Sequence, residues 1–246
     1  MRNRLFITGF AFLVIFSSCN KEKPLDKIID KSLAFSVKQY TLMTDVMKNK
    51  PDLLPRTTDA SGELVASNSG WWTSGFFPGS LWYLYEYSKD EKIKEAAIRM
   101  TSIVEKEKNN TGTHDLGFML YCSFGNGFML TGDQSYKDVL VTGARSLSTR
   151  FRPNIGCIQS WGSRKEWQCP VIIDNMMNLE LLMWAFNQTG DSGFYHIAVS
   201  HADTTILNHF RPDYSTWHVV SYDTITGRVE AKQTAQGAAD GSSWAR

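Results

Sequence analysis

Two short stretches of the chain place a carboxylate where acid–base chemistry can occur. In T-H-D-L-G-F at residues 113–118, an imidazole and a carboxylate precede an apolar segment. In V-I-I-D-N-M-M-N-L at residues 171–179, an acidic residue lies within an almost wholly apolar run. A charge there is costly unless it is paired or hydrogen-bonded, and burial lets such a carboxyl group exchange a proton near neutral pH. Asp174 is therefore the stronger candidate for a general acid, with Asp115 as its candidate partner.

Helix capping is the structural alternative for both aspartates. Each one precedes a predicted helix, where an Asp side chain often accepts hydrogen bonds from free backbone N–H groups. On spacing alone, capping explains Asp115 at least as well as catalysis does. For Asp174 the two roles are compatible, because a carboxylate at a helix N-terminus can also face a cavity.

Three further polar residues are candidates for substrate binding. His218 begins a predicted β-hairpin, and Gln236 lies in the glycine-containing segment Q-G-A-A-D. Arg246 ends the chain, and arginine suits bidentate recognition of a carboxylate or sulfate. Each of these residues taken alone is more often structural than functional.

The composition favours an ordinary globular protein with many aromatic rings. With 26 Lys+Arg against 25 Asp+Glu, the chain has no basic field that would attract nucleic acid. Its 8 Trp, 9 Tyr and 14 Phe suit a large core, although flat rings also form walls against which sugars stack. Trp71 and Trp72 begin the densest aromatic patch and are candidates for that second role.

The N-terminus has the features of an export signal. Arg2 and Arg4 precede an apolar run at residues 6–16, which is too short for a good membrane span. Two small residues then precede Cys19, as in the lipobox of bacterial lipoproteins. We expect a lipoprotein signal peptide over residues 1–19, lipidated Cys19, a tether over 20–25, and location in the periplasm or outer membrane. A plain signal peptide with an incidental cysteine is the alternative.

Three cysteines remain after that signal. An odd number cannot all pair internally, and no two of them form a C-x-x-C motif. Cys157 and Cys169 are candidates for a bridge in an oxidising compartment, and free buried thiols are an equal alternative to that bridge.

Helical periodicity dominates the rest of the chain. Apolar residues follow helical spacing at 26–49 and 91–107, Pro78 suits the first turn of another helix, and 115–131, 134–150, 174–188 and 192–210 are further helical segments. Residues 217–232 instead predict a β-hairpin. Successive helices with short connections predict helical hairpins, stacked as a solenoid or closed as a toroid. The absence of a fixed-period repeat disfavours the solenoid.

The motifs taken together resemble a known family. They are W-T-S-G-F-F-P-G at 72–79, H-D-L-G-F at 114–118, I-I-D-N-M-M-N-L at 172–179, Trp217-His218 at the hairpin, and Q-G-A-A-D-G-S-S-W-A-R at 236–246. In this order they resemble glycoside hydrolase family 88, the unsaturated glucuronyl hydrolases, over about residues 30–246. A sister family, the unsaturated rhamnogalacturonyl hydrolases, shares the general plan.

The resemblance implies an all-α fold, an (α/α)6 toroid of helical hairpins, over residues 26–246. In the family, the final motif continues through R-G-Q-A-W into further helices, whereas this chain ends at Arg246. We therefore expect a little more than half of a toroid, with apolar helix faces exposed.

The resemblance also implies a reaction on oligosaccharides produced by polysaccharide lyases. The unsaturated uronic acid at the non-reducing end is removed by hydration: a proton is delivered to C4, water adds at C5, and the resulting hemiketal opens. Asp174 matches the group that gives and takes the proton, and Asp115 matches the second essential acid. No metal, cofactor or protein partner is implied.

Other residues match positions that line the family's substrate site. His114 and His218 line it, and His218 is the candidate for holding the water. Gln236 and Arg246 match positions near the uronate or a sulfate, and Trp72, with Trp71, matches the sugar-stacking position.

Two alternatives stay open at this point. In one of them, the protein has the same fold but its substrate is an unsaturated galacturonyl–rhamnose disaccharide. In the other, the protein is a non-catalytic glycan-binding lipoprotein, which explains the aromatic patches but not an acid in an apolar run.

Overall fold

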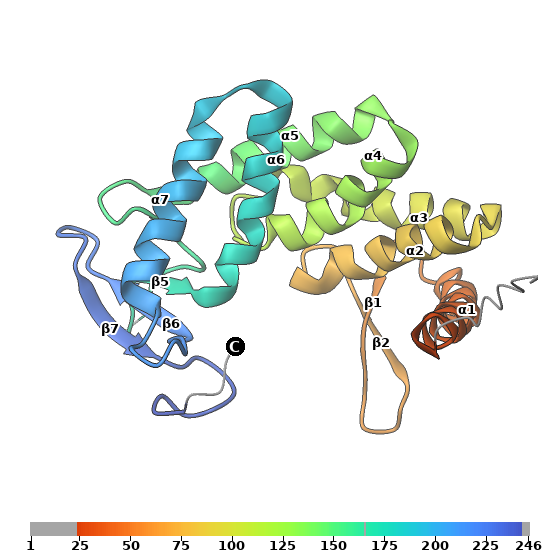
Figure 1. Cartoon of the computed structure of the whole chain (residues 1–246), viewed down its shortest axis with the longest axis horizontal. Helices are drawn as coiled ribbons and strands as arrows, with labels where there is room; N and C mark the ends of the chain where they lie inside the picture. Colours follow the sequence, from red (N-terminus) through yellow and green to blue (C-terminus); the bar gives the residue numbers. More distant parts are fainter. Residues whose placement is uncertain (1–23, 165, 243–246) are drawn as a thin grey trace, which may run out of the picture.

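The computed structural model describes residues 24–164 and 166–242, and Figure 1 shows its helices following one another in a curved row. The row runs from α1 at one end to α6 and α7 at the other. Its members are α1 (Pro24–Met47), α2 (Phe76–Ser88), α3 (Glu91–Val104), α4 (Asn126–Thr131), α5 (Gln134–Ser148), α6 (Leu179–Thr189) and α7 (Ser192–His209). Within these described residues, no helix is both long and apolar enough to span a bilayer.

Local signals set the ends of several helices close to the predicted positions. Asp90, Asp133 and Asp191 accept hydrogen bonds from backbone N–H groups at the start of α3, α5 and α7. Gly132 and Gly190 end α4 and α6 with φ angles of 69° and 73°, a left-handed conformation that glycine adopts without a Cβ clash. Each of these two glycines therefore marks the end of a helix.

The segment that follows Asp115 and the segment that contains Asp174 do not start as the α-helices that the sequence predicted. The first, η3 (Gly117–Gly125), is π-helical and leads into α4, and the second, η4 (Ile173–Asn178), is a 3₁₀-helix that leads into α6. Both conformations change the rotation between successive side chains, and π-helical turns often occur at functional sites. Two other 3₁₀-helices, η1 (Trp72–Gly75) and η2 (Glu105–Asn109), flank α2 and α3.

The strands of the described residues form three small sheets. The hairpin predicted over 217–232 is confirmed as β6 (Val219–Tyr222) paired with β7 (Val229–Gln233). A third strand that the sequence did not predict, β5 (Cys169–Ile172), pairs antiparallel with β6, and its residues are buried. Two small sheets were also not predicted, β1 (Leu54–Thr58) with β2 (Leu64–Ser67) and β3 (Phe151–Arg152) with β4 (Cys157–Ile158).

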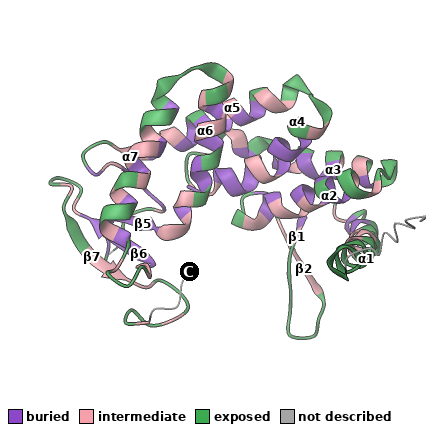
Figure 2. Cartoon of the chain, viewed as in Figure 1, coloured by how far each residue is buried: buried purple, intermediate pink, exposed green. Residues whose placement is uncertain are grey.

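The buried residues form one large cluster between the helices and a small one beneath the β5–β7 sheet, and Figure 2 shows how exposed α1 is by comparison. Trp82 lies in the large cluster, fully buried, and its indole Nε1 donates to Thr101 Oγ1 at 3.0 Å. Apolar side chains on α1, among them Leu25, Phe35 and Leu42, are about 60% exposed, in agreement with the expected exposure of apolar helix faces.

Cys157 and Cys169 both belong to the small cluster and carry free thiols, so the free-thiol alternative holds. Burial raises the pKa of the Cys157 thiol to about 12 and that of Cys169 to about 11, which leaves both protonated at neutral pH.

Candidate active site

Close backbone packing brings the two acidic motifs together. Gly117 of η3 lies against Asn178 of η4, and a Cβ on Gly117 would lie 2.6 Å from the Asn178 Cα. The backbone N–H of Phe118 donates to Asn178 Oδ1 at 3.1 Å. The glycine of H-D-L-G-F and the second asparagine of I-I-D-N-M-M-N-L therefore make a joint that holds the helix starts side by side.

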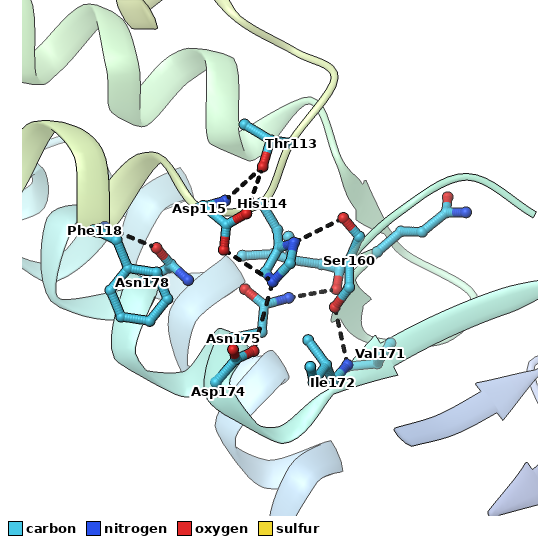
Figure 3. A network of polar contacts seen from close by, with 12 residues as sticks. Thr113, His114, Asp115, Phe118, Ser160, Val171, Ile172, Asp174, Asn175 and Asn178 are labelled. Carbon is cyan, nitrogen blue, oxygen red and sulfur yellow. Dashed lines mark hydrogen bonds and ion pairs between the residues drawn. The ribbon is translucent and has the colours of Figure 1, made fainter. Parts of the chain in front are cut away.

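The joint places one imidazole between two carboxylates. His114 Nε2 lies 3.3 Å from Asp115 Oδ1 and 3.6 Å from Asp174 Oδ1, as Figure 3 shows. The His114 side chain is 7% exposed, that of Asp115 16% and that of Asp174 39%. We call these three residues the central cluster. Its exposure increases toward Asp174, which leaves this carboxyl group the most accessible to a bound molecule.

The other nitrogen of His114 fixes the tautomer. Nδ1 lies 2.8 Å from the carbonyl oxygen of Ser160, which only accepts hydrogen bonds, so Nδ1 carries a hydrogen. In the neutral ring, Nε2 then has a lone pair directed at two carboxyl groups. Attraction requires either an imidazolium or one protonated carboxyl group. The central cluster thus brings one ring nitrogen and two carboxyl groups within reach of one another.

Asp115 is fixed by its own motif rather than by a helix end. The Thr113 hydroxyl donates to Asp115 Oδ2 at 2.8 Å and accepts from the Asp115 backbone N–H at 3.1 Å. No side-chain capping hydrogen bond occurs at the start of η3 or of η4. The capping hypothesis is therefore wrong for Asp115 and for Asp174 within the described residues.

The burial expected for Asp174 is also wrong. The apolar residues before it form strand β5, whose side chains pack under the sheet, and the chain turns into η4 directly afterwards. One carboxylate oxygen, Oδ1, is buried against His114, while the side chain as a whole is 39% exposed. The apolar run thus reflects a buried strand next to Asp174 rather than an apolar pocket around its carboxyl group.

Residues that the sequence did not single out hold the central cluster in place. The Ser160 carbonyl also accepts from Arg150 Nη2 at 3.0 Å. Ser160 Oγ accepts from the Ile172 N–H at 2.9 Å (Figure 3). Arg150 is buried and donates two further bonds, from Nε to the Gln159 carbonyl at 2.8 Å and from Nη1 to the Thr111 carbonyl at 2.7 Å. One guanidinium therefore joins the loop before His114 to the segment that orients its ring.

Neither Arg150 nor Ser160 lies in a sequence pattern that would have predicted its part in holding the central cluster. Burial lowers the pKa of Arg150, and among smaller effects the Asp115 carboxylate acts in the opposite direction. Asn175, in the second motif, is fully buried and its Nδ2 donates to the Ile158 carbonyl at 2.8 Å. This asparagine secures η4 against β4.

His218 is hydrogen-bonded to the residue before Asp174, and Gln236 is hydrogen-bonded to the His218 ring. The Ile173 N–H, next to Asp174, donates to the His218 carbonyl at 2.9 Å. His218 Nδ1 accepts from the backbone N–H groups of Ala235 at 3.1 Å and Gln236 at 3.4 Å, so the hydrogen of the neutral ring is on Nε2. Gln236 is exposed.

The two tryptophans have different surroundings. Trp72 is 44% exposed and contacts the rings of Phe76 and Phe118 at 5.8 and 6.1 Å, which connects it to the joint at Phe118. The Arg56 guanidinium lies 3.6 Å from the ring centre of Trp71 and covers one of its faces. The Trp72 ring is thus the more accessible of the two. Arg246 and Cys19 lie outside the described residues.

Two buried histidines near the sheet are structural. His201 Nδ1 accepts from the Ile158 N–H at 3.0 Å, and His209 Nε2 lies 3.0 Å from the Val171 carbonyl. Burial lowers the pKa of His201 to about 3 and that of His209 to about 4. Both rings are neutral at physiological pH, so neither supplies a proton there.

The chain has relatives among known proteins. No model of a protein family matches the chain. The chain is 42% identical over 251 residues to an unsaturated glucuronyl hydrolase of Formosa agariphila, which covers 98% of this chain and 62% of that protein. It also resembles an unsaturated glucuronyl hydrolase of Bacillus sp., at 33% identity over 81% of this chain and 54% of that protein.

A solved structure shows the same likeness in three dimensions. A crystal structure of an unsaturated glucuronyl hydrolase specific for heparin has a TM-score of 0.80 and 42% identity, covering 87% of this chain and 58% of that one. The predicted fold, part of a toroid of helical hairpins, is confirmed. The chain spans about 62% of the length of the Formosa relative.

Proposed function

We propose that this chain, which is homologous to the unsaturated glucuronyl hydrolases, carries the acid–base site of an enzyme that removes an unsaturated uronic acid from lyase-generated oligosaccharides. The observation that carries the proposal is the central cluster, in which His114 Nε2 lies within 3.3 and 3.6 Å of two carboxylate oxygens. These three residues come from two distant motifs, and the fold brings them to one point.

The proposed reaction is a hydration of the C4=C5 double bond. Protonated Asp174 delivers its proton to C4, and water adds to C5 while its proton passes to the Asp174 carboxylate. The product is a hemiketal at C5. It opens to a ketone, and the hemiacetal left at C1 then releases the remaining saccharide, so that one water is consumed for each sugar removed.

The surrounding residues support this assignment. Asp174 is the most exposed member of the cluster, so a sugar can reach its carboxyl group. Asp115, held by Thr113 and His114, is proposed to orient the sugar and stabilise developing positive charge. Trp72 offers an exposed ring for stacking, His218 is a candidate for holding the water, and Gln236 and Arg246 are proposed to contact the uronate or a sulfate.

Loss of the ultraviolet absorbance of the C4=C5 bond tests the proposal. Asp174→Asn should abolish that loss, and Asp203→Asn, which changes an exposed aspartate on α7, should leave it unchanged. Substantial turnover by Asp174→Asn would remove Asp174 as the proton donor. Saccharide binding without any turnover by the unmutated protein would indicate a glycan-binding protein instead. Lyase products of heparin, chondroitin and pectin should separate glucuronyl from rhamnogalacturonyl substrates.

We also propose that the protein is an exported bacterial lipoprotein of the periplasm or outer membrane, anchored through Cys19. The support is the basic region, the apolar run and the two serines before Cys19, all outside the described residues. In bacteria fed radiolabelled palmitate, the unmutated protein and Cys122→Ala should become labelled, and Cys19→Ala should not. Equal labelling of Cys19→Ala would contradict the anchor.

A further inference from the structure

A cation lies near the central cluster, on the loop between β4 and β5. Arg164 is exposed, and its guanidinium lies over two indole rings, 5.2 Å from the ring centre of Trp161 and 5.8 Å from that of Trp167. The two ring centres are 5.9 Å apart. Stacking on aromatic faces holds a guanidinium in place and leaves its N–H groups free to bind a ligand at their edge.

The backbone under Arg164 is fixed as well. Arg164 and Trp167 exchange two backbone hydrogen bonds, of 2.8 and 3.1 Å, which close a tight turn. Trp167 is buried, and its indole Nε1 donates to Gln233 Oε1 on β7 at 2.6 Å. Arg164 therefore sits on a turn that is anchored to the β5–β7 sheet.

Trp161 connects this turn to the central cluster. Its ring centre lies 6.3 Å from that of the His114 imidazole, so a single indole separates the guanidinium from the ring that faces both carboxylates. The indole Nε1 of Trp161 is buried and makes no hydrogen bond to any described residue. The rim of the candidate active site here thus combines an aromatic ring with a positive charge.

Among the described residues, the Arg164 guanidinium has no anionic partner. Across residues 24–164 and 166–242, Arg164 forms no ion pair and its side chain makes no hydrogen bond. Its five N–H donors remain available, and their planar arrangement suits a carboxylate or a sulfate. The nearly balanced charge of the chain makes this cation a local feature rather than part of a general basic surface.

We infer that Arg164, backed by Trp161, forms an anion subsite that binds a sulfate or carboxylate group of the saccharide held at the central cluster. The inference rests on the proposed function, because that function brings an acidic saccharide to the site. It assigns to Arg164 a contact separate from those proposed for Gln236 and Arg246, and so a part in selecting among sulfated substrates.

Equilibrium binding in an Asp174→Asn background, which prevents turnover during titration, tests the subsite. The probes are an unsaturated uronyl–hexosamine disaccharide with one sulfate and the same disaccharide without it, followed by tryptophan fluorescence. Arg164→Gln should weaken binding of the sulfated probe by about tenfold or more, since a charge-assisted hydrogen bond is lost. Arg164→Lys should lose less, and Arg228→Gln, which changes an exposed arginine in the β6–β7 turn, should lose nothing.

The unsulfated probe distinguishes the two anion sources. If Arg164→Gln weakens only the sulfated probe, the subsite binds sulfate, and equal weakening of both probes assigns it to a carboxylate. Unchanged affinity of Arg164→Gln, an equal loss in Arg228→Gln, or no binding of either probe would overturn the subsite. Turnover of the unmutated protein is measured separately. Its absence, together with an Arg164 effect on binding, would reject the proposed function and leave the anion subsite standing.

Discussion

Replacement of Arg150 by methionine should destabilise the protein strongly and loosen the central cluster. Arg150 is buried, and its guanidinium donates to the carbonyls of Thr111, Gln159 and Ser160 at 2.7, 2.8 and 3.0 Å. Methionine fills similar space but donates no hydrogen bond. All three carbonyls lose a charged donor, and the Ser160 carbonyl, no longer fixed by Arg150, can move away from His114 Nδ1.

The magnitude follows from these contacts. A hydrogen bond to a charged group contributes about 1.5–3 kcal/mol, and relief from burying the cation offsets part of the sum. We expect Arg150→Met to lower the free energy of unfolding by about 3–5 kcal/mol, which for a chain of this size lowers Tm by roughly 6–20 °C. Arg150→Lys should recover only part of the loss. The ammonium keeps the charge and its hydrogen-bond donors, but it cannot reach all three carbonyls at once.

Urea unfolding followed by tryptophan fluorescence measures the first effect. The matched control is Arg145→Met, which changes an exposed arginine on α5, the helix that ends just before Arg150. Nitrogen NMR of the His114 ring measures the second, because a displaced Ser160 carbonyl would no longer fix the hydrogen on Nδ1. A loss below about 1 kcal/mol, equal to that of Arg145→Met, would refute the assigned role of the guanidinium.

Two further outcomes are expected, each with a matched control. The folded-state pKa values of His201 and His209, about 3 and about 4, lie below the 6.5 of a free imidazole, so below pH 6.5 the unfolded chain binds protons that the folded chain rejects. Stability should therefore fall as the pH drops from 6.5 toward 4, by about 2 kcal/mol for each histidine at pH 5, and a flat profile over that range would contradict the burial argument. Replacement of the exposed His196 by Asn should leave this slope unchanged. Gly117→Ala should cost about 1–3 kcal/mol by forcing apart η3 and η4, whereas Gly162→Ala, with open space around it, should be tolerated, and equal stability of the two variants in thermal unfolding would show that the joint adapts.

Much of the fold was predictable because its signals are local. Apolar periodicity, aspartate N-caps and left-handed glycines lie within a few residues of the helix ends they determine, and the Asp223–Arg228 turn closes a hairpin between neighbouring strands. Strand β5 was missed because its partner β6 lies about 50 residues further along the chain. An isolated apolar run does not show whether it pairs with such a distant strand.

The order of the motifs in the sequence determined the family resemblance, the fold class and the choice of the two candidate acids, since each depends on residue types and their succession. Only the tertiary structure decided how those acids are placed. Asp174 is partly exposed because the run before it became a buried strand, and the His114 ring is fixed by a carbonyl that Arg150 also binds. The physical reason is that hydrogen bonds and ring contacts join residues far apart in sequence, here 46 positions between His114 and Ser160. No local pattern encodes such a contact, and Arg150, Ser160 and Arg164 therefore became visible only in the folded chain.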